Sequence, residues 1–459
     1  MSQERHRSGS TAKPDVRATS AVDIPEGYRM TELGPLPEEW RVVKLGEVIR
    51  SVKGRKPPMI VETPLMDGLP YLTAEYFRSN VANQFVPKEF LNSGEICEKN
   101  DVVLIWDGSK AGQVFTGLKG VLASTMVRLE PTTGNIERTF LYFYLLTQFE
   151  ILNSQTTGST IPHVNKTLFF NLPIPLPHLP EQRAIAHVLR TVQRAKEATE
   201  RVIQATRELK KSLMRYLFTY GPVPIDEAEK VPLKETEIGL VPEHWEVVKL
   251  ENCLSLIRNG ISKKQNATSK TGYPVTRIET ISEDRINPDK VGYIDNLTPT
   301  EVEKFRLRPG DILFSHINSE PQIGRSVIYE GWPSTLLHGM NLLLLRTNSN
   351  AIPYWLNYLF MHYRAIGIFI KIAARAVNQS SINQSKMKSL PIPLPPLPEQ
   401  HEIARILQAV DKKLQAEEAR KQALEALFKA LLNNLMTGKI RVKDVVLPNV
   451  GEGKGNVTH

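Results

Sequence analysis

The segment Leu390–Leu407 reads LPIPLPPLPEQHEIARIL, and the segment Leu172–Leu189, 218 positions earlier, reads LPIPLPHLPEQRAIAHVL. In both copies the alternating prolines fix φ and remove backbone donors, which favours a stiff extended segment. Pro180 and Pro398 can each occupy the first turn of a helix, where an N–H would have no helical partner. The glutamate that follows is favoured by the positive end of the helix dipole. Each copy therefore predicts a rigid strut joined directly to a helix start.

Behind each proline run, apolar residues at spacings of three and four predict a long helix with a coiled-coil seam. Each helix would have roughly 35 to 40 residues and a length of about 55 to 60 Å. Because the first helix must lead from the end of one half to the start of the next, we expect the two helices to pair antiparallel. The residues expected to pair are Ile185, Val188, Val192, Val202, Leu209, Leu213, Ile403, Ile406, Val410, Leu414, Leu424 and Leu431.

A second repeat opens each half of the chain. The segment Thr31–Leu45 reads TELGPLPEEWRVVKL and recurs at Thr236–Leu250 as TEIGLVPEHWEVVKL. The segments that begin and end each half are thus nearly identical in sequence, whereas the sequences between them have diverged. Loops drift fastest after any old duplication, but here the expected strands and helices have diverged as well. We interpret the chain as a tandem duplication whose halves dock alike and recognise different targets.

Each half mixes short strand-like runs with one buried-looking helix, expected at 136–149 and 354–370, which predicts an α+β domain. The expected fold is α+β, with two globular domains separated by two long helices that pair as an antiparallel coiled coil, related by a pseudo-twofold internal repeat. The expected divisions are flexible tails at 1–23 and 443–459, globular domains at 24–171 and 223–389, and a strut with its helix at 172–222 and 390–442.

Bulk composition narrows the class of protein. A net charge of +9 makes a polyanionic partner plausible, although many basic proteins bind no nucleic acid. The two cysteines are far apart and form no CxxC pair, which favours a reducing setting. The first twenty residues are polar, and the longest apolar run, around 342–345, is far shorter than a membrane span. We expect a soluble cytoplasmic protein without a membrane partner.

No catalytic motif is recognisable in the sequence. Neither a GxxxxGK[ST] phosphate loop nor the Asn/Asp-Pro-Pro-aromatic motif of amino-methyltransferases occurs. A nuclease-like Glu-x-Lys occurs at Glu208 and Lys210, but it falls within the first expected long helix, where both side chains would be solvated. The histidines lack metal-ligand spacing. We therefore expect no catalytic, cofactor or metal site in this chain.

Polar and basic residues in matching loops of the two halves are candidates for DNA contact. Lysine and arginine can grip phosphates, arginine can read guanine, and asparagine or glutamine suit adenine. For any single residue, a solvated surface side chain is an equally good interpretation, so the prediction concerns the loops. The candidates are Lys53, Arg55, Lys56, Thr160, His163, Asn165, Lys166, Arg258, Lys263, Lys264, Asn378, Gln379, Ser380 and Asn383.

The repeated segments resemble those of specificity (S) subunits of type I restriction–modification systems. The signature Leu-Pro-apolar-Pro-Leu-Pro-x-Leu-Pro-Glu-Gln occurs at Leu172–Gln182 and Leu390–Gln400. The domain-opening signature Thr-Glu-Ile-Gly-x-apolar-Pro-x-x-Trp occurs at Thr236–Trp245 and, slightly altered, at Thr31–Trp40. The helix ending Leu431–Val442 is also similar, whereas the first helix continues into a connector. The resemblance covers nearly the whole chain apart from its tails.

This resemblance implies a non-catalytic, sequence-specific DNA-binding subunit. Each recognition domain would read one half of an asymmetric, split site in double-stranded DNA. The helices would set the spacer, about one or two DNA turns at roughly 34 Å per turn, and would dock two methyltransferase (M) subunits. Two restriction (R) subunits would add translocation and cleavage. S-adenosylmethionine, and ATP with Mg, would be bound by the partner subunits and not by this chain.

Two other classes of function remain open at this point. One is a stand-alone DNA-binding or scaffolding protein, such as a duplicated repressor, and the other is an enzyme with an unrecognised site. Stable co-purification with a methyltransferase would separate the specificity subunit from both.

Overall fold

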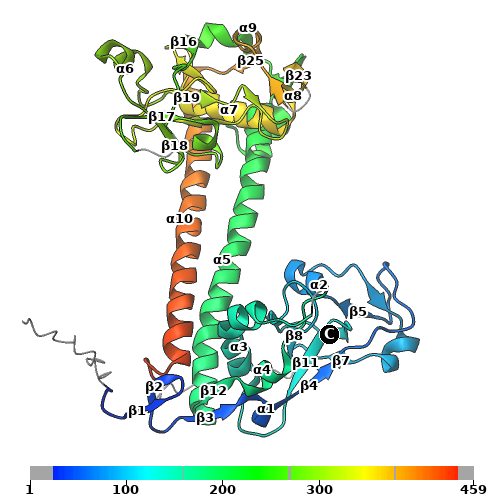
Figure 1. The fold of residues 1–459 in the computed structure, drawn as a ribbon. Coiled ribbons are helices and arrows are strands. Elements are labelled where there is room, and N and C mark those ends of the chain that lie inside the picture. The colour runs from blue at the N-terminus through cyan, green and yellow to red at the C-terminus, as the bar shows by residue number, and fades with distance from the viewer. Residues whose placement is uncertain (1–23, 159, 267–269, 377–378, 443–459) are drawn as a thin grey trace, which may run out of the picture. The chain divides into compact units, whose positions relative to one another are not determined.

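The structure is a computed structural model that describes residues 24–158, 160–266, 270–376 and 379–442 (Figure 1). The chain divides into two compact units, Met1–Glu197 with Gln422–His459, and Ala198–Lys421. Two long helices, α5 (Leu179–Tyr220) and α10 (Leu397–Met436), contribute to both units. They contain 42 and 40 residues. None of the helices in the described part of the chain combines the length and apolar character of a membrane span.

The first unit is built from short strands and one large buried helix. Its strands are β1 (Tyr28–Thr31), β2 (Gly34–Pro37), β3 (Arg41–Lys44), β4 (Ile49–Lys53), β5 (Leu69–Leu72), β6 (Phe85–Val86), β7 (Ile96–Cys97), β8 (Val102–Ile105), β9 (Val114–Phe115), β10 (Gly120–Leu122), β11 (Met126–Pro131) and β12 (Pro173–Leu176). Its shorter helices are α1 (Leu45–Val48), α2 (Ala74–Ser79), η1 (Lys88–Ser93), α3 (Arg138–Ser154) and α4 (Lys166–Asn171). The strands form two four-stranded sheets, β4-β11-β8-β9 and β6-β5-β10-β7, and the two-stranded pairs β1-β2 and β12-β3.

The second unit repeats this plan. Its strands are β13 (Leu233–Thr236), β14 (Gly239–Pro242), β15 (Glu246–Lys249), β16 (Leu254–Asn259), β17 (Tyr273–Thr276), β18 (Val291–Ile294), β19 (Ile312–Phe314), β20 (Ile317–Asn318), β21 (Ser326–Ile328), β22 (Leu343–Thr347), β23 (Ala374–Ala376), β24 (Gln379–Ser381) and β25 (Pro391–Leu394). Its shorter helices are η2 (Ile225–Lys230), η3 (Leu250–Cys253), η4 (Ile278–Ile281), α6 (Pro299–Phe305), α7 (Pro353–Ala365), α8 (Ile368–Ile372) and α9 (Gln384–Lys388). The sheet β16-β22-β19-β21 takes the place of β4-β11-β8-β9.

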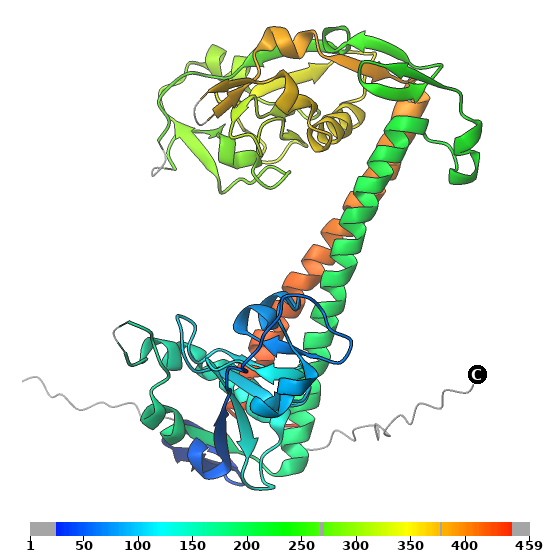
Figure 2. The same ribbon diagram turned by 90° about the vertical axis from the view of Figure 1, so that its right-hand side faces the viewer.

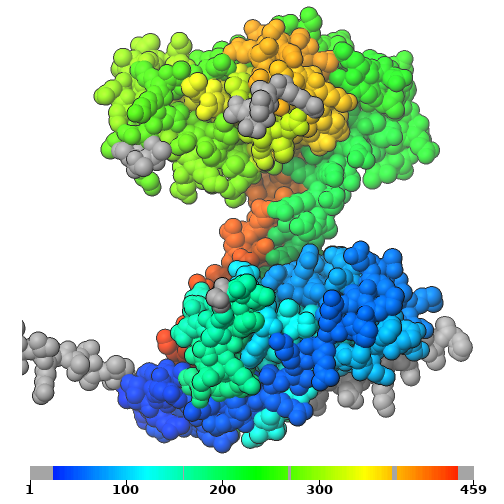
Figure 3. All heavy atoms as spheres, turned by 45° about the vertical axis from the view of Figure 1, so that its right-hand side comes forward, coloured from blue at the N-terminus to red at the C-terminus, as the bar shows by residue number. Residues whose placement is uncertain are grey.

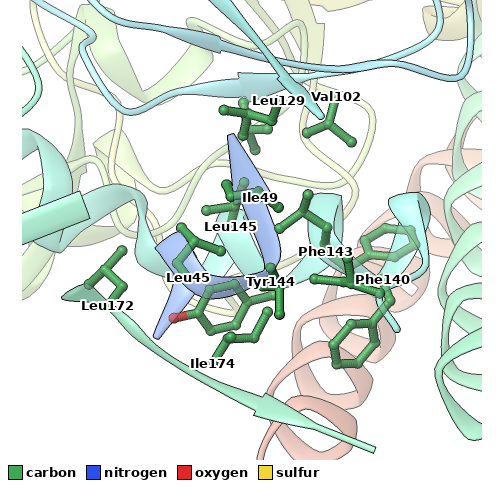
Figure 4. Close-up of a cluster of buried hydrophobic side chains, with 14 of the residues drawn as sticks. Leu45, Ile49, Val102, Leu129, Phe140, Phe143, Tyr144, Leu145, Leu172 and Ile174 are labelled. Carbon is green, nitrogen blue, oxygen red and sulfur yellow. The ribbon is translucent and has the colours of Figure 1, made fainter. Parts of the chain in front are cut away.

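The main core of the first unit lies between α3 and the sheet β4-β11-β8-β9. In Figure 4, Ile49 of β4 and Leu129 of β11 lie near the apolar face of α3, which carries Phe143 and Leu145. All four side chains are buried. In the second unit, α7 packs in the same way beneath β16-β22-β19-β21. From the sequence we expect one helix at 354–370. In the structure α7 ends at Ala365, and α8 begins after Gly367, which has a left-handed backbone conformation.

The proline runs are strands and not free struts. The strand β12 pairs antiparallel with β3, and β25 pairs antiparallel with β15. A proline cannot donate to a ladder, but prolines at alternate positions leave the N–H groups of the residues between them intact. Each proline run therefore ties the end of its domain to the strand that opens it, and the chain then enters the long helix.

The two long helices pair antiparallel, as the sequence predicts. In the second unit, salt bridges join Glu200 to Lys421 at 2.8 Å and Lys210 to Asp411 at 2.6 Å, so residue numbers rise along α5 as they fall along α10. In the first unit, the start of α5 shares a core with the end of α10. Within each unit the two helices run side by side in both ribbon views (Figure 1, Figure 2). The α+β fold with an internal repeat is confirmed.

Candidate functional site

The two repeated signatures meet at a hydrogen bond from a buried tryptophan in each unit. The indole Nε1–H of Trp40 donates to the Glu181 carboxylate at 3.0 Å, and that of Trp245 donates to Glu399 at 2.8 Å. Both indoles are fully buried, and a buried indole N–H needs an acceptor. The glutamate of each proline run is therefore the partner of the tryptophan that opens the same domain.

The glutamine of each signature adds hydrogen bonds at the same place, where the domain meets the start of its long helix. We call this contact region the junction. Gln182 is fully buried, and its amide nitrogen donates to the carbonyl oxygens of Asn135 and Pro177, both at 2.8 Å. Its amide oxygen accepts the backbone N–H of Glu137, also at 2.8 Å. Gln400 makes the three corresponding bonds in the second unit, at 2.9 to 3.0 Å. These bonds hold the loop before each large domain helix against the start of a long helix.

The first unit adds an arginine to its junction. The Arg441 guanidinium donates to both oxygens of Glu181, at 2.6 and 2.8 Å, and to Glu39 at 2.8 Å. These hydrogen bonds raise the pKa of Arg441 above its usual range. The hairpin β1-β2, dark blue in Figure 3, lies beside the end of α10, and Tyr28 there donates to the Gly438 carbonyl at 2.6 Å. The segment that follows α10 is thereby tied to the opening of the first domain.

The helix seam repeats every seven residues, but one of the two positions expected in each heptad of α5 lies one residue before the position that is buried. Val202 and Leu209, expected to pair, are exposed, with 40% and 52% of their surface accessible. The positions turned inward are instead Ile203, which is buried, and Lys210, which is partly buried, each one residue further along the helix. The other position of each heptad, at Val192, Thr199, Thr206 and Leu213, is buried or partly buried, so the seven-residue repeat of a coiled coil holds along α5.

The other expected seam residues are buried or partly buried. Ile185 and Ile403 are fully buried in the first and second cores. The remaining members are partly buried: Val188, Val192, Leu213, Ile406, Val410, Leu414, Leu424 and Leu431. The seam predicted from the sequence thus matches the helix ends better than the middle of α5.

One charged cluster brings together two of the candidate DNA-contacting residues. Lys53 ends β4, and its Nζ lies 2.9 Å from Oδ2 of Asp107. His163 lies on the loop before α4, and its Nδ1 is 2.7 Å from Oδ1 of the same carboxylate. The side chains of Lys53 and His163 are about half exposed, whereas that of Asp107 is 15% exposed. Asp107 was not a candidate, because it lies more than fifty positions from both partners in sequence.

Two candidate asparagines cap helices. Asn165 Oδ1 accepts the backbone N–H of Leu168 at 3.1 Å at the start of α4, and Asn383 Oδ1 accepts that of Lys386 at 2.8 Å at the start of α9. Both asparagines have extended backbone conformations that suit an N-cap.

Replacing Asn165 or Asn383 by alanine is expected to lower the free energy of unfolding by about 1 kcal/mol, because each replacement leaves a backbone donor without its cap. Urea unfolding of the two variants measures this loss. Asn83→Ala, a change in a loop of the first unit, is the control and should leave stability nearly unchanged. Unchanged stability in both cap variants would contradict the capping role.

Two further candidates are held by contacts inside the second unit. Arg258 donates to the Lys304 carbonyl and lies 5.2 Å from the centre of the Phe305 ring. Lys263 forms a salt bridge with Glu301 at 2.7 Å. That lysine and the bonds from Thr298 lower the pKa of Glu301 to about 2. These cations stabilise the contact between the β16 edge and α6, in addition to any role toward a ligand.

The structure does not bring the remaining candidate DNA-contacting residues together within the described part of the chain. Arg55, Lys56, Thr160, Lys166 and Lys264 are exposed, and Ser380 is buried in β24. Asn378 lies outside the described residues, and so does the side chain of Gln379.

A basic groove in the second unit was not foreseen. It has a volume of about 730 Å³ and lies between β16, β22 and α6. Burial and the neighbouring guanidinium groups of Arg346 and Arg308 lower the pKa of Arg258. The alternating cations of the segment KFRLR could have drawn attention to this groove. Its cationic lining residues are Arg258, Lys304, Arg306, Arg308 and Arg346.

Comparison with known proteins agrees with the repeated architecture. A family model described as "Type I restriction modification DNA specificity domain" matches residues 37–207 and 242–426. The MjaVIII specificity subunit of a type I restriction enzyme from Methanocaldococcus jannaschii is 32% identical over 420 residues, covering 89% of this chain and 95% of that protein. The EcoKI specificity subunit from Escherichia coli is 23% identical over 425 residues, covering 88% of each chain.

A solved structure has the same fold. The type I restriction–modification S subunit from M. genitalium superposes with a TM-score of 0.58 at 16% identity, over 86% of this chain and 96% of that chain. At this identity the likeness concerns the fold alone. The family match extends over more than half of the chain and falls once in each half of the repeat. The chain therefore belongs to the type I restriction–modification DNA specificity family.

Proposed function

We propose that this chain is the non-catalytic specificity subunit of a type I restriction–modification complex. Each unit reads one half of an asymmetric, split site in double-stranded DNA. The observation that carries the proposal is the repeated junction, Trp40–Glu181–Gln182 and Trp245–Glu399–Gln400, on which two different domain interiors are mounted. Two copies of one frame with different surfaces are what two unlike half-sites require.

Contacts to the DNA backbone are assigned to the cationic surface. The groove lined by Arg258, Arg306 and Arg308 gathers positive charge in the second unit, and Lys56 and Lys264 are exposed in loops of the two units. Such contacts position a protein on DNA without reading its sequence and supply much of the salt-dependent affinity.

The partners proposed for this chain are two methyltransferase subunits and two restriction subunits, in the cytoplasm. The two repeated junctions offer two equivalent docking positions for the methyltransferase subunits, and the helix pair sets the spacer between the half-sites. S-adenosylmethionine, and ATP with Mg, are assigned to the partner subunits. This chain contributes recognition alone.

Co-expression with the methyltransferase of the same restriction system, followed by single-molecule mapping of N6-methyladenine in host DNA, tests the proposal. We expect one split motif that is methylated only when both proteins are present, because neither recognition nor methyl transfer suffices alone. A stable complex with an active methyltransferase that produces no new motif would overturn the proposal and favour a scaffolding protein.

A further inference from the structure

The strand ends that carry Lys53 and Asn259 occupy the same position in the two units. Lys53 is the last residue of β4 and pairs with Val127 of the central strand. Asn259 is the last residue of β16 and pairs with Leu343 of the central strand. In each unit the same central residue also pairs with the next strand of the sheet, β8 or β19. The two registers therefore align Lys53 with Asn259.

The backbone beyond these strand ends is also the same. A Cβ atom on Gly54 would lie 2.2 Å from the Ala123 carbonyl oxygen, and one on Gly260 would lie 2.3 Å from that of His338. Both distances are far below van der Waals contact, so only glycine fits at either position. The chain therefore leaves both strands along one path.

A second backbone contact, between the segment just beyond β8 or β19 and the loop before α4 or α9, is also the same in the two units. The backbone N–H of Val164 donates to the Trp106 carbonyl at 2.9 Å, and that of Ile382 donates to the His316 carbonyl at 2.8 Å. Each of these bonds is followed directly by the capping asparagine of α4 or α9. The neighbouring backbone bridges, Asp107 with His163 and Ile317 with Ser381, also correspond.

The side chains mounted on this shared backbone are entirely different. The first unit has the charged cluster, in which Asp107 accepts from Lys53 and contacts His163. At the corresponding positions the second unit has Asn259, Ile317 and Ser381. There, the Gln384 amide nitrogen donates to the Asn259 amide oxygen at 3.3 Å. The two units thus share the glycine, the backbone hydrogen bond and the capping asparagine at this position, whereas the side chains around them differ. Such an arrangement suits the recognition of two different ligands.

The backbone that carries Asp107 is hydrogen-bonded to a residue that lines a groove. The backbone N–H groups of Trp106 and Asp107 both donate to the Thr125 carbonyl, at 2.9 and 3.0 Å. Thr125 also lines a groove of about 740 Å³. Other residues that line this groove are Tyr71, Thr73, Tyr76, Arg78, Asn83 and Gln84. A base edge at Lys53 would therefore have polar and aromatic surface beside it.

We propose that these corresponding positions are the base-reading centres of the two units. The cluster Lys53–Asp107–His163 reads a G·C pair in one half-site, and the pair Asn259–Gln384 reads an A·T pair in the other. The inference rests on the proposed function, since it presupposes a split DNA site.

The chemistry of the two centres decides between the base pairs. Lys53 carries three N–H donors, and its bond to Asp107 occupies one of them. The remaining donors suit the O6 and N7 acceptors of guanine in the major groove. The carboxylate of Asp107 fixes the position of the ammonium group. Asn259 and Gln384 each offer a donor and an acceptor side by side, the arrangement that matches N6 and N7 of adenine.

Methylome mapping of the complex with its methyltransferase tests the proposal through two variants. Lys53→Met keeps the length of the side chain and removes its donors, and Gln384→Leu removes one amide. We expect Lys53→Met to reduce discrimination about tenfold or more at one G·C position of one half-site. Gln384→Leu should do the same at one A·T position of the other half-site. Lys88→Met, on the exposed surface of the first unit, is the matched control and should preserve the motif.

Binding to modified duplexes gives a reading that does not depend on a variant. Replacing the guanines of the relevant half-site one at a time by 7-deazaguanine should weaken binding of the wild-type complex about tenfold at one position. Binding that is indifferent to every such replacement would overturn the assignment of the charged cluster. A wild-type split motif that persists unchanged in both variants would overturn the inference alone. The absence of any split motif in the wild type would overturn the proposed function with it.

Discussion

Replacing Glu181 by alanine is expected to lower the free energy of unfolding of the first unit by about 3 kcal/mol. The buried carboxylate accepts hydrogen bonds from Trp40 at 3.0 Å and from Arg441 at 2.6 and 2.8 Å. Removing the carboxylate leaves the Trp40 indole N–H without its acceptor and leaves Arg441 with Glu39 as a partner. Removing one partner of a buried, hydrogen-bonded ion pair typically destabilises a protein by about 3 to 5 kcal/mol, and the bond to Glu39 places this loss at the lower end. Urea unfolding with hydrogen exchange resolved by segment measures the loss and shows which unit it affects.

Glu399→Ala is the matched control in the second unit. It removes the bond to the Trp245 indole and the contact with His244, which has a half-exposed side chain. No arginine corresponds to Arg441 among the described contacts of Glu399. We therefore expect a smaller loss, about 1 to 2 kcal/mol. Equal losses in the two variants would show that Arg441 contributes nothing, and a Glu181→Ala protein as stable as the wild type would contradict the account of the junction.

At the junctions, the local structure can be predicted from the sequence, but the contacts between distant segments cannot. Alternating prolines followed by Glu-Gln predict an extended segment and a helix start, and both are found at Pro173–Leu176 and at the start of α5. The pairing of that segment with β3 could not be predicted, because its partner lies about 130 positions earlier and prolines argue against a central strand. The roles of the glutamate and glutamine also depend on this pairing, since it brings Trp40 and the loop before α3 to the helix start.

The DNA-contacting loops stay a prediction, but the structure shows what several of their side chains contact within the chain. Asn165 and Asn383 were proposed for DNA contact because amides suit adenine, but the same chemistry caps a helix, and the structure places both at N-caps. The contacts of Asp107 could not be predicted from the sequence, because its partners, Lys53 and His163, come from distant segments. Local patterns identify a polar loop, whereas the grouping of side chains within it is set by how strands and loops meet.

Acidification from pH 7 to pH 5 is expected to destabilise the second unit selectively, because two of its histidines are buried and a third is partly buried. Burial lowers the pKa of His338 to about 3, and it lowers those of His316 and His362 to about 4. In the unfolded chain each has an ordinary pKa of about 6.5. Below that value the unfolded chain binds protons that the folded unit does not, so stability present at neutral pH is lost as the pH falls from about 6.5 toward 3.

For His338 alone this linkage amounts to about 2 kcal/mol between pH 7 and pH 5, and the other two histidines add to it. Urea unfolding as a function of pH, with hydrogen exchange assigned to each unit, measures the effect. In the variant His338→Gln this position cannot titrate, so the pH dependence should be reduced to the part due to His316 and His362, even if stability at pH 7 is lower. Because the slope reports proton uptake and the absolute stability reports packing, the two effects separate. Equal stability at pH 7 and pH 5 in the wild type would mean that these histidines are protonated in the folded unit, and hence that solvent reaches them.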